Sequence, residues 1–483
     1  MPPVARPLIA IALGGAAALG PPTRSSAEGV TLEIPAEAPG GPLRRRVERV
    51  LPPHVGCAVL VIGEDASGEA VDFRAGYGRV GLADDAARVT PRTNFRVASF
   101  SKVLTALAVL RLADAGKLSL DDPVTRWLAG MPEWAQRCTL GSMLDHTSGV
   151  AAYHGLIRPT RVVGGPAARF TDLNVFNAVA SAPPQFRPGG DCRYSNSAYV
   201  LLGLVVQQAT VDPMHVALRQ WALRPAGMAR SEVLVPALNP VEDRAYGHRP
   251  GELEQRVAQI VQQTQLQLNQ FRELQNRRDL PAAQLNAFKE QVARLEARLE
   301  RFAPPPELAG AEWHVEDQSE YSELGGDGAL YTSVDDLAAL IRAVMERGPL
   351  LSEASWRLWT APQSTPPPGD GFGDSAAGRR FACGWVVDDR TGETRLSHRG
   401  ETRGFRQTVQ VFPDSGRAVA VLMNNAAIDV ETGADWTEAQ FERLGERVMR
   451  GVLGPIDTVE LEPEVTAIEE TTDPFELRRD ADR

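Results

Sequence analysis

The first residues that could do chemistry are a serine and a lysine, Ser99 and Lys102, in the run ASFSK at the start of an apolar segment. On a helix, a spacing of three residues places both side chains on one face, within reach of each other. A serine hydroxyl is a poor nucleophile until a neighbour removes its proton. A lysine can accept that proton when burial lowers its pKa, whereas an arginine stays charged.

Lysine is rare in this chain, where only three of the 51 basic residues are lysines. A lysine at this place therefore favours a catalytic pair over the alternative, which is a helix-capping serine beside a solvated lysine. The helix N-terminus also supplies partial positive charge where an oxyanion would form.

Two later segments complete a possible constellation. The first is Tyr194-Ser195-Asn196, which follows a Pro-Gly-Gly turn, and the second is His398-Arg399-Gly400, at the end of a predicted strand. Each segment alone is also compatible with a structural role, a core tyrosine in one case and a strand-end histidine in the other.

Other common motifs are absent or misplaced. The sequence has no G-x-S-x-G elbow and no H-E-x-x-H. Residues 76–81 match G-x-G-x-x-G, but turn residues and Pro91 follow, where a dinucleotide-binding fold needs the start of a helix. This segment therefore indicates a turn-rich strand end.

Taken in order, S-x-x-K, Y-x-N and H-x-G resemble the serine penicillin-recognising family, which holds class C β-lactamases, D,D-peptidases, D-aminopeptidases and family VIII esterases. The resemblance covers about His54 to Asn425, apart from 251–302. Four supporting stretches are also similar to that family: LDHTSG at 144–149, LRPAGM at 223–228, GGDGALYTSVDD at 325–336 and CGW at 383–385.

The resemblance implies a role for each motif residue. Ser99 would be the acylated nucleophile, Lys102 the proton acceptor beside it, and Tyr194 the group that passes a proton to the leaving group. Asn196 would hydrogen-bond the carbonyl of the substrate. His146 and Ser148 belong to a stretch that supports the fold in the family, so they are left out of catalysis.

The third motif would form the opposite wall. The backbone N–H groups of Ser99 and Glu401 would make the oxyanion hole, and Gly400 would let the substrate approach the strand edge. The family commonly begins this motif with lysine, whereas this chain has His398, which is mostly neutral near pH 7. Arg399 alternates to the other face of the strand. Histidine here resembles esterases and aminopeptidases more than efficient β-lactamases.

The elements that must position these residues follow from hydrophobic periodicity. A helix is expected from Ser99 to Ala115, with Gly116 ending it. Between Leu118 and Leu238 the pattern is helix-like and is broken by Pro and Gly. A last helix is expected at Glu438–Val452. Strands are expected at Gly56–Gly63, Val71–Arg79, Phe381–Val387, Thr394–His398, Phe405–Phe412 and Ala418–Met423.

Strands at both ends of the chain with helices between them predict an α+β fold, an antiparallel β-sheet flanked by helices with an inserted helical domain. The expected divisions are an export signal, 1–27; a discontinuous α/β catalytic domain, 28–115 and 325–455; a helical domain, 116–324, containing a coiled-coil hairpin at 251–303; and an acidic tail, 456–483.

The hairpin prediction rests on apolar spacing. In its second half, six residues follow spacings of 3, 4, 3, 4 and 3: Leu285, Phe288, Val292, Leu295, Leu299 and Phe302. In the first half the same register is interrupted at Thr264 and Gln267, and Asp279-Leu280-Pro281 predicts the turn. The hairpin either packs on its own chain or serves self-association or a protein partner.

Composition narrows the function. The chain has 483 residues, 43% of them hydrophobic, and 62 acidic against 51 basic residues, which excludes a disordered protein and argues against nucleic-acid binding. The four cysteines form no C-x-x-C, so neither a zinc site nor a disulfide framework is indicated; the pairs Cys138–Cys192 and Cys57–Cys383 are left open.

The N-terminus predicts export. Arg6 precedes an apolar run of small residues at 8–19, and the run SSA at 25–27 offers a cleavage site. The apolar run is too short to span a bilayer. The alternative is an Ala/Gly-rich N-terminus without structure. We expect a secreted or periplasmic protein with no stable membrane span.

Together these features predict an exported serine hydrolase that cleaves an ester or amide through an acyl-enzyme and resembles an esterase or D-aminopeptidase. The substrate would be a small ester, amide, D-amino-acid peptide or β-lactam, and no metal or organic cofactor is implied. One alternative is a true β-lactamase or D,D-carboxypeptidase. The other is a non-catalytic protein of the same fold that binds a partner through 251–303.

Overall fold

A computed structural model describes most of the chain between 41 and 454. The described residues are 41–52, 56–157, 171–235, 241–250, 264, 267–268, 271–272, 282–300, 313–315, 325–366, 379–390, 392–402, 404–425 and 438–454. The expected export signal at 1–27, the acidic tail at 456–483 and most of the first half of the inserted hairpin lie outside them. The described residues belong to one compact unit, Ile34–Arg483.

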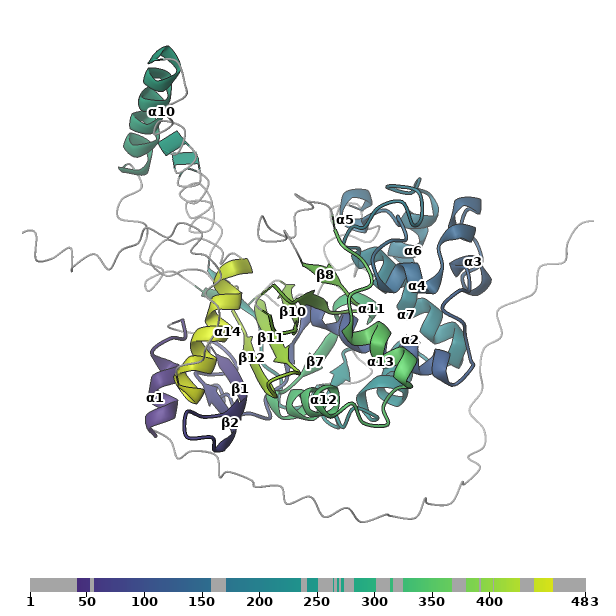
Figure 1. The fold of residues 1–483 in the computed structure, drawn as a ribbon, viewed down its shortest axis with the longest axis horizontal. Coiled ribbons are helices and arrows are strands. Elements are labelled where there is room, and N and C mark those ends of the chain that lie inside the picture. Colours follow the sequence, from purple (N-terminus) through teal and green to yellow (C-terminus); the bar gives the residue numbers. More distant parts are fainter. Residues whose placement is uncertain are drawn as a thin grey trace, which may run out of the picture. The chain divides into compact units, whose positions relative to one another are not determined.

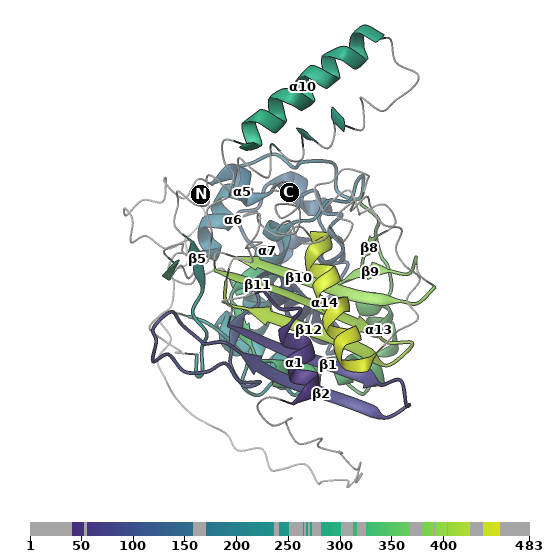
Figure 2. The same cartoon turned by 90° about the vertical axis from the view of Figure 1, so that its left-hand side faces the viewer.

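The main feature is an antiparallel sheet of seven strands, ordered β2-β1-β12-β11-β10-β9-β8 (Figure 2). The strands are β1 (Cys57–Glu64), β2 (Ala70–Tyr77), β8 (Arg380–Phe381), β9 (Val386–Asp388), β10 (Arg395–Thr402), β11 (Phe405–Phe412) and β12 (Arg417–Met423). The N-terminal pair joins the C-terminal strands where β1 pairs with β12. This confirms the expected antiparallel sheet completed by both ends of the chain.

Helices cover both faces of this sheet. Along β1, Ala58 and Leu60 face the larger core, while Cys57, Val59 and Val61 face a second cluster. That second cluster is closed by α1 (Pro42–Glu48) and α14 (Glu438–Leu453), which lie across the sheet in Figure 2. A central strand buried on both faces has no polar side, because successive side chains point to opposite faces. This explains the unbroken apolar run in β1.

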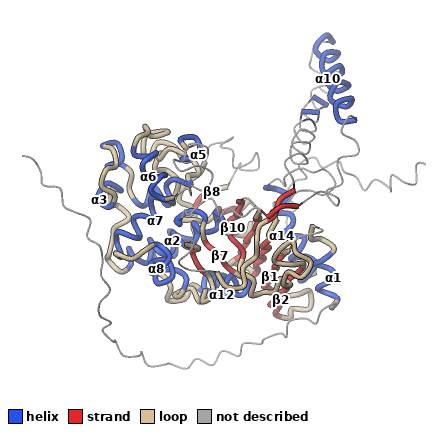
Figure 3. The backbone as a smooth tube through the Cα atoms, turned by 180° about the vertical axis from the view of Figure 1, so that it is seen from behind, coloured by secondary structure: helices blue, strands red, loops and turns tan. Residues whose placement is uncertain are grey.

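The larger core surrounds α2 (Ser101–Asp114), which is buried along nearly its whole length. A helix that is apolar on all sides needs neighbours on all sides. They include α7 (Asn196–Thr210), α8 (Met214–Leu218), α11 (Gly325–Gly328) and α13 (Glu353–Thr360). Figures 1 and 3 show the remaining helices of this region gathered beside α7: α3 (Val124–Trp127), α4 (Leu140–Leu144), α5 (Tyr153–Leu156) and α6 (Asp172–Ala180).

Three of the differences between the expected and observed elements concern the segments around Ser99, Lys102 and His398. The helix at Ser99 begins as a 3₁₀ turn, η1 (Ala98–Phe100), before α2. The strand expected at Phe381–Val387 is split into β8 and β9, because Gly384 lies between them at φ +84°, where a Cβ would come within 2.8 Å of Lys102 O. The strand expected to end at His398 continues to Thr402, paired with β11.

Two further findings concern the cysteines and membrane spans. All four cysteines are free and buried, so the pairs Cys138–Cys192 and Cys57–Cys383 are not formed. Within the described residues, no helix combines the length and apolar character needed to cross a membrane.

The insertion is described in part. Its second half is α10 (Ala282–Glu300), and Leu268 packs with Val292 and Leu295. The rings of Phe271 and Phe288 lie 5.9 Å apart. Thr264 is buried and Gln267 is exposed, so the buried side of the first half passes through Thr264 and Leu268 instead of Gln267.

At the base of the insertion, two short strands bring its ends together. These are β5 (His248–Pro250) and β6 (Trp313–Val315), which pair antiparallel with Pro250 opposite Trp313. The chain therefore leaves and re-enters the body at adjacent positions.

Candidate active site

Ser99 lies where a strand of a small sheet turns into α2. The strand β3 (Phe95–Arg96) pairs with β7 (Leu330–Thr332), and the next residues form the 3₁₀ turn η1. Ala98 has φ +45°, a left-handed conformation that costs a residue with a side chain about 1–2 kcal/mol. Strained backbone of this kind collects at functional sites. Here it places the Ser99 hydroxyl at the N-terminal end of α2.

Lys102 is buried one turn further along. Its Nζ lies 3.1 Å from Ser99 Oγ and also donates a hydrogen bond to the backbone oxygen of Asp327, at 3.2 Å. The same Nζ lies 5.0 Å from the centre of the Tyr194 ring and 5.8 Å from that of Tyr199. The serine–lysine distance is suitable for proton transfer.

Tyr194 and Asn196 stand on either side of the residue that caps α7. Ser195 Oγ accepts a hydrogen bond from Ala198 N, at 3.1 Å, so α7 begins at Asn196. The buried Oδ1 of Asn196 has no hydrogen-bond partner among the described residues, although its side chain lines the same cavity as Ser99. An unpartnered amide oxygen beside a nucleophile is available to a substrate.

The opposite wall is β10. Its pairing with β9 stops at Ser397, so the strand edge from His398 to Thr402 has no registered neighbour on that side among the described strands. A Cβ on Gly400 would lie 2.2 Å from Val97 O, so only glycine lets β10 approach η1 this closely. Glu401 follows and lines the cavity with Ser99.

The cavity these elements enclose has a volume of about 130 Å³. It brings together three of the residues expected from sequence, Ser99, Asn196 and Glu401, while Lys102 reaches it through its bond to Ser99. Tyr194 and His398 are not among its lining residues; their ring centres lie 6.2 Å apart. The full lining is Arg96, Ala98, Ser99, Tyr153, His154, Asn196, Asp327, Gly328, Glu401 and Thr402.

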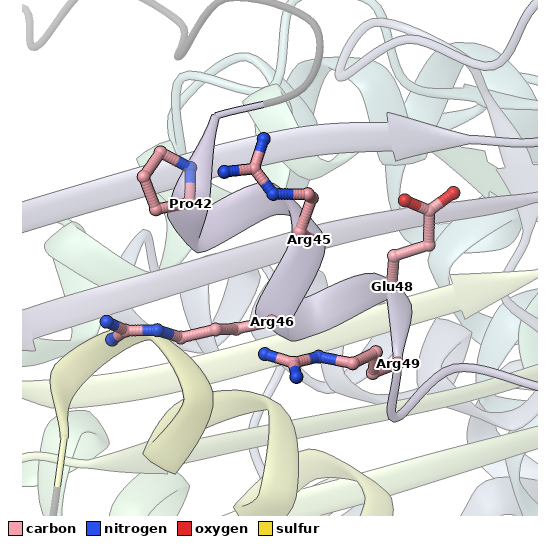
Figure 4. Close-up of a pocket in the computed structure, with 5 residues that line it drawn as sticks. All are labelled: Pro42, Arg45, Arg46, Glu48 and Arg49. Carbon is pink, nitrogen blue, oxygen red and sulfur yellow. The ribbon is translucent and has the colours of Figure 1, made fainter.

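A more open cavity, of about 550 Å³, lies on α1 (Figure 4). It is lined by Pro42, Arg45, Arg46, Glu48 and Arg49, and the figure shows the three guanidinium groups extending from one short helix. None of the expected site residues lines it. Volume alone therefore does not identify the site of chemistry in this molecule.

Burial keeps His398 neutral. Its pKa is lowered to about 3, first by burial and then by the charge on Lys102. Nδ1 lies 2.5 Å from the backbone oxygen of Arg399, and since a carbonyl only accepts, Nδ1 carries the proton. Nε2 is thus left as an acceptor.

Arg406 is buried and pairs with Glu401 at 2.5 Å.

Sequence reasoning missed the four other ionisable residues that line the cavity: Arg96, Tyr153, His154 and Asp327. Tyr153 donates a hydrogen bond to Asp327 Oδ2, at 3.2 Å. Burial raises the pKa of Asp327, and the positive charge of Lys102 opposes that shift. Asp327 lies within GGDG, a stretch noted only as support, and Tyr153 follows HTSG by four residues. The sequence feature that could have identified them is a polar or charged residue within a mainly apolar or glycine-rich stretch.

Comparison with known proteins agrees with this geometry. The family model described as beta-lactamase matches residues 55–441. The chain is 39% identical over 164 residues to esterase EstB of Burkholderia gladioli, and 34% identical over 150 residues to penicillin-binding protein 4 of Amycolatopsis lactamdurans. These segments are 31% and 30% of this chain and 41% and 38% of those proteins, so the matches span less than half of either relative.

Solved structures resemble a larger part of the chain. The penicillin-binding protein from Bacillus halodurans has a TM-score of 0.59 at 20% identity, covering 84% of this chain and 99% of that one. A D-amino acid amidase from Ochrobactrum anthropi SV3 has a TM-score of 0.58 at 18% identity, covering 86% and 98%. At this identity the likeness is one of fold.

Proposed function

Because the chain belongs to the beta-lactamase family of serine hydrolases, we propose that it is an exported enzyme that cleaves an ester or amide bond through an acyl-enzyme on Ser99. The observation that carries the proposal is the 3.1 Å distance between Lys102 Nζ and Ser99 Oγ, beside a cavity that Asn196 and Glu401 also line. Export rests on the sequence of 1–27 alone.

In the proposed acylation, Lys102 accepts the hydroxyl proton as Ser99 Oγ bonds to the carbonyl carbon of the substrate. The oxygen of the tetrahedral intermediate is stabilised by the backbone N–H groups of Ser99 and Glu401. The bond to the leaving group then breaks, and Tyr194 passes a proton to the departing oxygen or nitrogen. Lys102 Nζ lies 5.0 Å from the centre of the Tyr194 ring, so the two residues proposed to carry protons are neighbours.

In the second half of the cycle, water attacks the acyl-enzyme ester. The same groups accept the proton of that water and return one to Ser99 Oγ, which releases the acid and restores the free enzyme. Asn196 Nδ2 donates to a carbonyl oxygen of the substrate, a role that its place in the cavity supports, while its Oδ1 can accept from a substrate N–H.

The site favours substrates without a carboxylate beside the scissile bond. His398 is neutral and so supplies no permanent cation, and the nearby Arg406 is already paired with Glu401. The esterase among the relatives and the D-amino acid amidase among the structures agree with this preference. We propose small neutral esters or amino-acid amides as the substrate class.

A second candidate, a true β-lactamase or D,D-carboxypeptidase, is favoured by one observation. Arg96 lines the cavity, and an arginine keeps its charge at every physiological pH. Its guanidinium would attract a substrate carboxylate even though His398 does not.

Intact-mass analysis tests both candidates. The folded protein would be incubated separately with a fluorophosphonate, p-nitrophenyl butyrate and a penicillin, beside Ser99→Ala as control. We expect a fluorophosphonate adduct that is absent from Ser99→Ala, and turnover of the ester. A long-lived or rapidly hydrolysed penicillin adduct would favour the second candidate. A folded protein that none of the three reagents modifies, and that turns over neither ester nor penicillin, would contradict an acyl-enzyme mechanism.

A further inference from the structure

His146 is a strained residue next to the site that the proposed mechanism does not use. It follows α4 in the turn 145–149, is 2% exposed and has φ +66°. Residues with a side chain rarely adopt this conformation, and they keep it only where the surroundings fix it. The contacts that fix His146 in this conformation are therefore expected to matter for the neighbouring site.

Two hydrogen bonds join His146 to the residues on both sides of Tyr194. The backbone oxygen of His146 accepts from Arg193 N at 3.0 Å, and its ring Nδ1 accepts from Ser195 N at 3.1 Å. The backbone of Tyr194 is therefore held before and after the residue by one partner. Both bonds connect segments that lie far apart in the sequence, so only the folded chain forms them.

The His146 ring also touches the Tyr194 ring. Their centres lie 4.8 Å apart with an interplanar angle of 36°, and Phe381 packs edge-on against His146 at 4.7 Å. Tyr194 in turn contacts Phe381 at 6.1 Å. Lys102 Nζ and the His398 ring also lie near the tyrosine ring, 5.0 Å and 6.2 Å from its centre, so several neighbours restrict its position.

Nδ1 can accept this bond only when it carries no proton, so His146 must be neutral with its proton on Nε2. Burial, together with the charge on Lys102, lowers the pKa of His146 well below its usual value, which is consistent with that state.

We propose that His146 is a positioning residue that holds Tyr194 where it can pass a proton to the leaving group. The inference rests on the proposed acyl-enzyme function. It assigns His146 no contact with the substrate: the residue acts through the backbone on both sides of Tyr194 and through its ring. The turn 145–149 is then part of the catalytic apparatus as well as of the fold.

Two esters with one acyl group separate this role from a general loss of structure. p-Nitrophenolate leaves without a proton, whereas the alkoxide of ethyl butyrate needs one, so only the second ester depends on Tyr194. The readout is the ratio of kcat/KM for ethyl butyrate to that for p-nitrophenyl butyrate. Tyr194→Phe defines how far the ratio falls when the proton donor is removed.

The variants are His146→Gly and His146→Asn, both of which suit a positive φ. Asparagine keeps an acceptor at the position of Nδ1 but loses the ring, whereas glycine loses both. We expect the ratio to fall by about tenfold or more in His146→Gly and by about threefold in His146→Asn. In Tyr194→Phe, adding His146→Gly should change the ratio little, because both act on one proton transfer.

A matched control is Val211→Gly, which relieves the same backbone conformation (φ +61°) at the exposed far end of α7 and should leave the ratio unchanged. Equal losses on both esters in His146→Gly would overturn the inference while leaving the acyl-enzyme in place. If His146→Gly does not fold, an unchanged ratio in His146→Asn overturns it. A wild-type protein without fluorophosphonate labelling at Ser99 would overturn the proposed function, and this inference with it.

Discussion

At the scale of single residues, a substitution at Lys102 can distinguish two roles for this side chain: supplying positive charge, or accepting the Ser99 proton. Lys102 is completely buried and bonded to both Ser99 Oγ and the Asp327 backbone. A cation that served only to neutralise charge could be exchanged for another cation. A base cannot be replaced by arginine, which does not give up its proton.

We expect Ser99→Ala and Lys102→Arg to abolish hydrolysis of p-nitrophenyl butyrate while circular dichroism shows an intact fold. Steady-state kinetics measure the effect, and Lys117→Arg, an exposed lysine beyond α2, is the matched control with unchanged activity. More than about a tenth of wild-type kcat in Lys102→Arg would mean that this lysine is not the base.

The side chain at position 398 bears on the charge of the substrate that the site accepts. Since His398 is neutral, we expect small neutral esters to be turned over far better than penicillins. Replacing His398→Lys supplies a cation and should raise the relative rate on carboxylate-bearing substrates, measured as a ratio of kcat/KM values. His215→Lys on α8, away from the cavity, should leave this ratio unchanged. Efficient penicillin or cephalosporin hydrolysis by the wild type would contradict the expectation.

At the scale of elements, the site depends on how closely β10 approaches η1. Gln407 Nε2 donates to Arg96 O at 2.5 Å, and Gly400 lies against Val97 O, so two residues set the spacing between sheet and nucleophile. The geometry of an oxyanion hole tolerates little displacement.

Gly400→Ala should therefore push β10 away from Ser99. We expect kcat/KM on p-nitrophenyl butyrate to fall at least about tenfold, and fluorophosphonate labelling of Ser99 to slow in parallel. Gly451→Ala on α14, where a Cβ meets open space, should leave both rates unchanged. Wild-type labelling in Gly400→Ala would show that β10 does not form the oxyanion hole.

None of the described residues of 251–303, the segment that we predict to be an inserted hairpin, belongs to the site. Neither α10 nor the described residues between 264 and 272 line the active-site cavity. Leu268 and Phe271 contact α10, and Arg272 pairs with Glu296 at 2.8 Å, which favours pairing of the two halves within the chain. Self-association or a partner remains the alternative that we propose to test.

Because β5 and β6 bring the ends of the insertion together, a short Gly/Ser linker can replace Glu252 to Ala303. We expect kcat on a small ester to stay within about tenfold of wild type. Size-exclusion chromatography of both proteins would show whether the hairpin serves self-association. A folded but inactive deletion variant would place the hairpin in the active site, against the modular view.

At the scale of the whole molecule, buried neutral histidines link stability to pH. For His398 the folded pKa is about 3 and the ordinary value is 6.5, so between these values the unfolded chain binds a proton that the folded chain does not. Stability is therefore full above about pH 6.5 and is lost as the pH falls toward 3. His146 acts in the same direction.

Urea unfolding at several pH values measures this linkage. Between pH 6.5 and 5, we expect the wild type to lose about 2 kcal/mol more unfolding free energy than His398→Asn, which has no group to protonate there. Parallel losses in the two proteins would show that His398 does not contribute to acid sensitivity.

The sequence by itself determined the order of the motifs, most strands of the antiparallel sheet and the contact between Ser99 and Lys102. These follow from short-range rules. A spacing of three residues places Ser99 and Lys102 on one turn, and the strand expected at Phe405–Phe412 has the bounds of β11.

Only the tertiary structure decided which additional polar groups share the cavity. Asp327 reaches Lys102 across 225 residues, and Tyr153 reaches Asp327 across 174. The break between β8 and β9 likewise exists because Gly384 packs on the backbone of Lys102, and His146 gains its role from the two bonds around Tyr194. No local pattern encodes such contacts, since each depends on how distant segments pack together, and packing is a property of the whole core.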